Sequence, residues 1–147
     1  MHSDNISLPT ENDFLSPESR DPDERSALQN FLGKTPEQAE EMFRKCFLSY
    51  QEDLTYMRTP AFCFYVIPAI SYLCSDAADG DSDAASTFCS VMEARMRAGL
   101  DAIRPIAPAA SEAVRQILAR FDRFKCNPEI YGDIPARYKR LLGKLTA

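Results

Sequence analysis

The fold is decided by residues 33–73, which read GKTPEQAEEMFRKCFLSYQEDLTYMRTPAFCFYVIPAISYL in a chain of 147 residues. Thr35 is suited to cap a helix, Pro36 to occupy its first position, and Gln38 to complete a capping box. From Ala39 to Met57, apolar residues recur at helical spacing. This pattern predicts one helix of about five turns with a single broad apolar stripe.

A second helix is predicted immediately afterwards, because Thr59 and Pro60 repeat the cap-and-proline signal. Its residues from Ala61 to about Cys74 are apolar almost all round, so we expect this helix to be the central one. Pro68 removes one backbone hydrogen bond and crowds the preceding turn, so a kink is expected there.

The rest of the chain also shows helical periodicity. A short helix is expected to begin near Pro22 and to end at Gly33, and Asp83 is the expected cap of a helix that follows the polar loop 76–83. Two more apolar series cover residues 114–124 and 135–145, and no window alternates with a period of two. We therefore predict an all-α protein, a compact bundle of about five helices.

The first 24 residues differ in composition from the body. They contain three prolines and few large apolar residues, and such a segment buries too little surface to offset its ordering entropy. We predict a disordered, flexible acidic tail over residues 1–24 and a single helical domain over residues 25–147. Docking of Phe14 and Leu15 against the body is the alternative.

The charge is unevenly distributed. Residues 1–33 carry 7 acidic and 2 basic side chains, residues 34–112 carry 12 and 7, and residues 113–147 carry 3 and 8. The acidic segments repel phosphate, which disfavours nucleic-acid binding, and such binding would depend on the C-terminal segment. The residues that would carry it are Arg137, Lys139, Arg140 and Lys144.

Several chemistries are disfavoured by residue type. The single histidine, His2, falls in the predicted tail, and the five cysteines form no C-x-x-C pair, so we expect no metal, no cofactor and no Cys–His or Ser–His–Asp catalysis. No signal peptide is visible, and the longest apolar run has 14 residues where a membrane span needs about 20. We expect a cytoplasmic protein with reduced thiols and no membrane partner.

Two local motifs have simpler structural explanations. Gly33-Lys34-Thr35 before a helix resembles the end of a phosphate-binding loop, but Leu28 stands where that loop needs its first glycine. The aspartates of the loop 76–83 could suggest calcium, but an EF-hand frame through Gly80 would begin and end on serines.

Asp53 is the most informative polar residue. On a helical wheel it lies at the edge of the apolar stripe, whereas Glu52 faces water. A half-buried carboxylate needs a partner, so we expect a hydrogen bond that orients the two predicted helices; a ligand-binding or catalytic role is the alternative. Aromatic residues near Pro68 could form a pocket or simply a core. The candidate ligand-binding residues are Tyr50, Asp53, Met57, Tyr65 and Tyr72.

The stretch 33–73 as a whole resembles a family of small uncharacterised bacterial proteins, a domain of unknown function. That resemblance implies a bacterial, cytoplasmic origin and assigns no activity. The positions that match are Glu52, Asp53, Leu54, Met57, Ala61, Phe62, Tyr65, Tyr72 and Leu73.

Three functions remain from the sequence. The first is a non-enzymatic protein-interaction module that binds another protein, or itself, through a helical surface. The second is a small-molecule-binding or weakly catalytic protein with an aromatic pocket near Asp53 and Pro68. The third is a nucleic-acid accessory protein that acts through its basic C-terminal segment.

Overall fold

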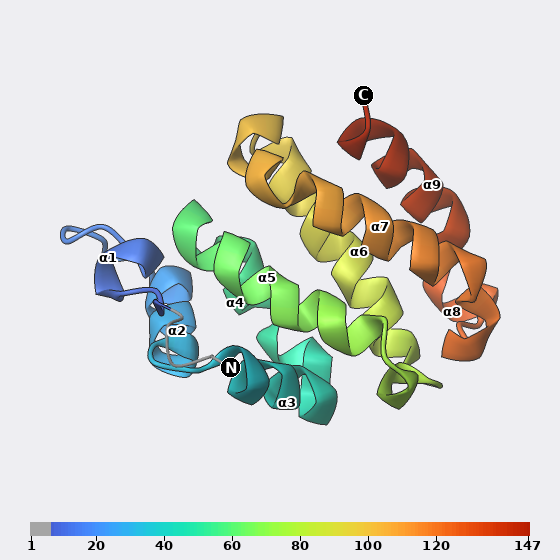
Figure 1. The fold of residues 1–147 in the computed structure, drawn as a ribbon, viewed down its shortest axis with the longest axis horizontal. Helices are drawn as coiled ribbons and strands as arrows, with labels where there is room; N and C mark the ends of the chain where they lie inside the picture. The colour runs from blue at the N-terminus through green and yellow to red at the C-terminus, as the bar shows by residue number, and fades with distance from the viewer. Residues whose placement is uncertain (1–6) are drawn as a thin grey trace.

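The computed structural model describes residues 7–147, and in this range it contains α- and 3-10 helices and no β-strand (Figure 1). The all-α class predicted from the sequence is confirmed. The chain is divided into more and shorter helices than the five or so expected. The α-helices are α1 Glu11–Phe14, α2 Pro22–Phe31, α3 Pro36–Cys46, α4 Gln51–Tyr56, α5 Thr59–Leu73, α6 Ser82–Arg97, α7 Ala107–Ala119, α8 Pro128–Tyr131 and α9 Ile134–Leu145.

Short 3-10 helices connect these elements. Most of them lie where proline, glycine or a polar cluster interrupts the apolar periodicity, as sequence reasoning expects of connections. They are η2 Phe47–Tyr50, η3 Asp76–Ala78, η4 Leu100–Ala102, η5 Arg104–Ile106 and η6 Phe121–Phe124.

The N-terminal segment does not behave as a free tail where the structure describes it. Phe14 is fully buried and Leu15 is 6% exposed. The carbonyl of Phe14 accepts a hydrogen bond from the main-chain N–H of Arg58, and the Arg58 side chain bonds the carbonyl of Asn12. The structure thus places Phe14 and Leu15 against the body, as in the docking alternative, and the flexibility of the other residues of this segment stays a prediction. Residues 1–6, which include His2, lie outside the described part of the chain.

The long helix expected between Pro36 and Met57 is interrupted. Its start is as predicted, because the Thr35 hydroxyl accepts from the N–H of Gln38 and the Gln38 side chain accepts from the N–H of Thr35. Cys46 then adopts φ −165° and ψ 90°, and the chain continues as η2 and α4. The interruption leaves Cys46 exposed and buries Phe47, whereas the sequence pattern placed Cys46 in the apolar stripe.

α5 packs between α3 on one side and α7 on the other (Figure 1). It runs through Pro68 to Leu73 as one continuous helix, with the proline side chain buried. The kink at Pro68 stays a prediction. α5 is also less central than expected, because one of its faces is open to solvent and Ile67 is 42% exposed.

The second half of the chain forms a group of helices at the end of the molecule opposite α1 and α2, where α9 packs against both α6 and α7 (Figure 1). α6 begins two residues earlier than expected, because Asp81 rather than Asp83 is its cap and accepts from the N–H of Ala84. α9 is capped by Asp133, whose carboxylate accepts from the N–H of Ala136.

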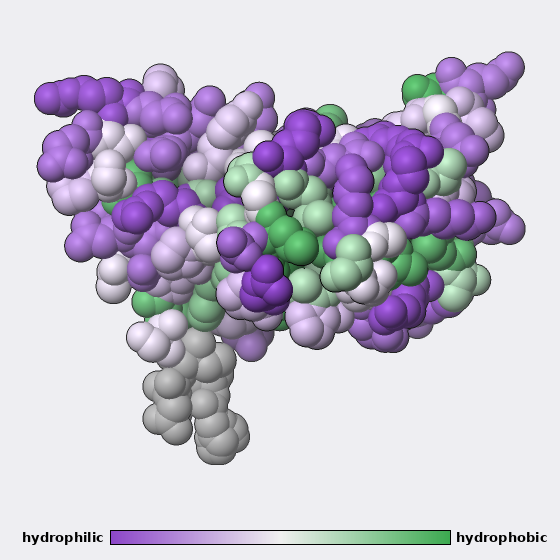
Figure 2. All heavy atoms as spheres, turned by 90° about the horizontal axis from the view of Figure 1, so that it is seen from above, coloured by the Kyte–Doolittle hydropathy of each residue, from purple (hydrophilic) through white to green (hydrophobic). Residues whose placement is uncertain are grey.

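One connected apolar core joins the two halves, and it includes both Phe14 from α1 and Leu145 from α9. Burial of this apolar surface is the main favourable contribution to folding. The face drawn in Figure 2 is largely hydrophilic and carries smaller hydrophobic areas between the hydrophilic ones. Aromatic side chains dominate the core, and the largest fully buried ones are Phe14, Phe31, Phe43, Phe47, Phe62, Tyr65, Phe88, Phe124 and Tyr138.

Candidate functional site

Asp53 is buried as predicted, but its partners come from a different helix. It is 4% exposed, and its two carboxylate oxygens accept hydrogen bonds from the Ser26 hydroxyl at 2.8 Å and from the Asn30 side-chain amide at 2.7 Å. Both donors belong to α2. Asp53 therefore joins α4 to α2, where the sequence analysis expected a bond between α4 and α5. Its neighbour Glu52 is exposed, in agreement with the predicted wheel.

Tyr65 connects α5 to the α2–α3 turn through hydrogen bonds. Its hydroxyl donates to the carbonyl oxygens of Phe31 at 2.9 Å and Lys34 at 2.8 Å. Burial raises the pKa of Tyr65 to about 12. A hydroxyl held in this way is turned toward the main chain and supports the turn that separates α2 from α3.

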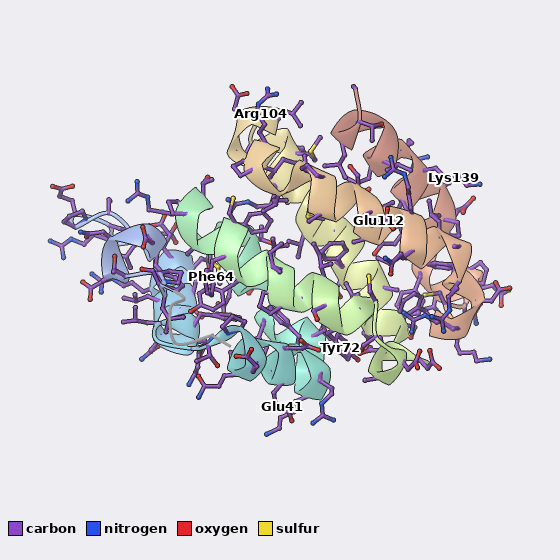
Figure 3. The ribbon with its side chains drawn as sticks, viewed as in Figure 1. Glu41, Phe64, Tyr72, Arg104, Glu112 and Lys139 are labelled. Atoms are coloured by element: carbon purple, nitrogen blue, oxygen red, sulfur yellow. The ribbon has the colours of Figure 1, made fainter. Side chains whose placement is uncertain are left out.

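Tyr72 makes a similar connection at the C-terminal end of α5. Its hydroxyl donates to the Asp81 carboxylate at 2.5 Å, and burial together with this bond raises the pKa of Tyr72 well above its usual range. Figure 3 shows Phe64 and Tyr72 toward opposite ends of α5. Tyr72 therefore belongs to the α5–α6 connection rather than to the surroundings of Asp53.

The remaining two candidates lie in the core or at its edge. Met57 is 1% exposed. Tyr50 is half-buried and packs edge-on against Phe31 and Phe43, with ring centroids 5.6 Å and 6.2 Å apart. The structure thus distributes the five predicted site residues over the core, and the polar atoms of three of them hold helices together. Their binding of a ligand stays a prediction.

Two arginines that the sequence patterns did not single out are integral to the helix packing. Arg95 is 7% exposed; its Nη1 donates to the carbonyls of Thr55 at 2.9 Å and Met57 at 2.6 Å, and its guanidinium lies 4.2 Å from the centre of the Phe62 ring. It thereby satisfies carbonyls at the C-terminal end of α4, where a positive charge is favourable. The sequence does contain a sign that Arg95 is buried, because this residue lies four positions after Val91 and therefore on the apolar side of α6.

Arg123 repeats this arrangement at the end of α5. It bonds the carbonyls of Leu73 and Ser75, pairs with Asp79 at 2.7 Å, and lies over the Phe124 ring at 4.3 Å. In both arginines the buried Nε has no hydrogen-bond partner among the described residues. Each guanidinium donates to carbonyls at the C-terminal end of a helix and lies over a phenylalanine ring, so both arginines have a structural role.

All five thiols are free, and four of them are not activated. Cys63, Cys74, Cys89 and Cys126 each have a pKa raised above the usual value, with burial as the largest cause in every case. A raised pKa lowers the fraction of reactive thiolate at neutral pH. In residues 7–147, moreover, no group of three or more His, Cys, Asp or Glu side chains is arranged to hold a metal ion.

The outer face of α5 is the surface feature that the packing leaves unexplained. Helical spacing places Pro60, Phe64, Ile67 and Ser71 on one stripe, and none of them is buried. No residue of Thr59–Leu73 is charged. We call these four residues the α5 stripe. Figure 1 shows α5 in front, with no other helix drawn over it.

No family model, curated protein or solved structure matches this chain. Among the described helices, none combines the length and the apolar character needed to cross a bilayer.

Proposed function

We propose that this protein is a non-enzymatic interaction module that binds another protein through the α5 stripe. The observation that carries the proposal is the absence of charge from the exposed face of a helix 15 residues long. Exposed helix faces in soluble proteins normally carry charged and polar residues. A helix of this length extends for about 22 Å, which suits contact with a partner helix.

The composition of the α5 stripe also favours a protein partner. Ile67 is 42% exposed, and Phe64 is partly exposed beside it, so two large apolar side chains face outward from adjacent turns. Exposed apolar patches of this kind mark protein-interaction sites in soluble proteins. Aromatic residues are enriched at such interfaces.

The interior supports the same proposal over the alternative of an aromatic ligand pocket near Asp53 and Pro68. The Asp53 carboxylate, the Tyr65 hydroxyl and the Tyr72 hydroxyl are engaged by Ser26 and Asn30, by main-chain carbonyls and by Asp81. A ligand there would have to displace interactions that join helices. We further propose, from the resemblance over residues 33–73, that the protein is bacterial and cytoplasmic.

The test places a photo-crosslinking residue at Ile67 or at Ser71 in cells of the source organism. A matched control places it at Gln116, which is exposed on α7. The α5 positions are expected to give a discrete crosslinked protein that the control does not give. The purified partner should then bind at least tenfold more weakly to Ile67→Glu than to the parent, with an unchanged helical circular dichroism spectrum.

A crosslinked second copy of this chain would identify the partner as the protein itself. The same yield of the same products from Gln116 and the α5 positions would contradict the proposal, as would an unchanged affinity of Ile67→Glu.

A further inference from the structure

A half-enclosed cavity of about 420 Å³ lies where η6, α8 and the beginning of α9 meet. Its volume falls in the range of small-molecule sites, about 300–1,000 Å³. We call it the C-terminal cavity. It is lined by Phe121, Asp122, Cys126, Pro128, Asp133 and Pro135, and by Gly132.

The walls of the C-terminal cavity are set by rigid backbone. Pro128 and Pro135 lie in the first turns of α8 and α9, where the proline ring fixes φ. The Asn127 side chain accepts from the N–H of Glu129 and caps α8. Gly132 joins the two helices at φ +77°, a conformation that residues with a side chain rarely adopt. The cavity is therefore preformed, which lowers the cost of binding.

The charge on its lining is entirely negative. Asp122 and Asp133 contribute two carboxylates and no Lys or Arg lines the cavity; neither carboxylate forms an ion pair within residues 7–147. The nearest arginines along the chain are engaged elsewhere, Arg123 by Asp79 and Arg137 by Glu93. The Cys126 thiol is close to two more aspartates, Asp83 and Asp81. Burial is the largest cause of its raised pKa, and the negative charges of these aspartates add to the effect.

The remaining lining is apolar and aromatic. The Phe121 ring is half-buried and packs against Phe124 with centroids 6.0 Å apart, which leaves part of it toward solvent. Two prolines provide flat apolar walls. Carboxylates recognise a cation by charge, an aromatic ring attracts it through its π-face, and apolar walls bury the carbon chain that bears it.

We propose that the C-terminal cavity binds an organic cation, a guanidinium or ammonium group on a short apolar stem. This site is separate from the α5 stripe, and the proposal does not depend on the function assigned to that surface. The cation would pair with Asp122 and with the Asp133 oxygen that does not cap α9, and its stem would lie against Pro128 and Pro135.

The cavity provides its own reporter, because Cys126 lines it. Alkylation of Cys126 by iodoacetamide is measured by mass spectrometry in the presence of butylguanidinium, with neutral butylurea of the same shape as the control. Cys46 is exposed at the end of α3 and does not line the cavity, so it serves as the control thiol in the same sample. Butylguanidinium is expected to protect Cys126 in a saturable way at concentrations at least fivefold below those of butylurea, and to leave Cys46 unchanged.

Two variants test the carboxylates without disturbing the fold. Asp122→Asn removes a surface charge, and Asp133→Asn keeps a residue that caps helices well. Each should raise the concentration needed for protection about threefold to fivefold, as expected for the loss of one charge close to a cation in water. Asp101→Asn, an exposed aspartate that pairs with Arg104 on η5, is the matched control and should change nothing.

The source of the cation is distinguished by a peptide, acetyl-Ala-Arg-Ala-amide. If the peptide protects at lower concentration than butylguanidinium, the ligand is an arginine side chain of another protein; if it does not, the ligand is a free small molecule. Equal protection by butylurea would overturn the proposal. So would the absence of protection together with an unshifted Gly132 amide resonance in titrations with butylguanidinium.

Discussion

At the scale of single residues, buried polar side chains connect helices through hydrogen bonds. Asp53 joins α4 to α2, Tyr65 joins α5 to the α2–α3 turn, and Arg95 joins α6 to the end of α4. Each of these side chains satisfies donors or acceptors that would otherwise be buried without a partner, which is the costly alternative. The pattern around Asp53 predicted its burial and its structural role. It could not identify Ser26 and Asn30 as partners, because helical periodicity carries no information about which helix packs on which face.

Asp53→Ala is expected to lower the free energy of unfolding by about 1–3 kcal/mol, because the Ser26 and Asn30 donors lose their acceptor in a largely buried contact. Glu52→Ala is the matched control on the same turn, and its exposed side chain should change the free energy by no more than about 0.5 kcal/mol. Urea denaturation of both variants beside the parent measures the difference. Equal losses at the two positions would contradict the structural role of Asp53.

At the scale of elements, the start of α3 could be predicted from the sequence, whereas the interruption of the expected helix at Cys46 could not. Thr35, Pro36 and Gln38 form the cap that their residue types suggest. Cys46 has no proline or glycine beside it, yet the helix ends there. The interruption moves Phe47 into the core and redirects α4 toward α2 and α6. Tertiary packing therefore overrides a locally favourable helix, and a single sequence has no signal for that choice.

The N-terminal segment is a second element that differs from its prediction, because its composition suggested disorder and the structure places Phe14 in the core. One aromatic side chain is decisive: Phe14 is fully buried, and its ring lies 5.8 Å from that of Tyr65. A segment of only a few residues needs little buried surface when the body already provides a complete apolar wall for it. Average composition cannot reveal such a wall.

Phe14→Ala is expected to lower the free energy of unfolding by about 3–5 kcal/mol and to expose residues 7–20 to protease, because α1 loses its only fully buried side chain. Asn12→Ala is the control, since the Asn12 side chain is exposed and its contact with Arg58 uses the main chain. Limited proteolysis followed by mass spectrometry gives the cleavage sites. Cleavage of the parent within residues 7–20 as rapid as that of Phe14→Ala would show that the segment is not docked.

At the scale of the whole molecule, the core accommodates several ionisable groups only in their neutral forms. Burial raises the pKa of Cys89 from 9.0 to about 12 and that of Tyr65 from 10.0 to about 12, and it also raises the pKa of the fully buried Tyr138 well above its usual value. A raised folded-state pKa means that the unfolded chain releases its proton first. The stabilisation is thus complete below the unfolded value and is lost as the pH rises toward the folded value.

Stability is therefore expected to be nearly constant up to about pH 8 and to fall above pH 9, as the unfolded chain loses first its cysteine protons and then, above pH 10, its tyrosine protons. Each group contributes a slope of about 1.4 kcal/mol per pH unit between its two pKa values. Denaturation in reducing buffer at intervals from pH 7 to 11 measures the slope. Cys89→Ala should reduce it by about one such contribution above pH 9, even if the small cavity lowers stability at every pH. If the slope of Cys89→Ala equals that of the parent, the Cys89 thiol is not held neutral by the core, and the loss at alkaline pH has its origin in the tyrosines and the other partly buried thiols.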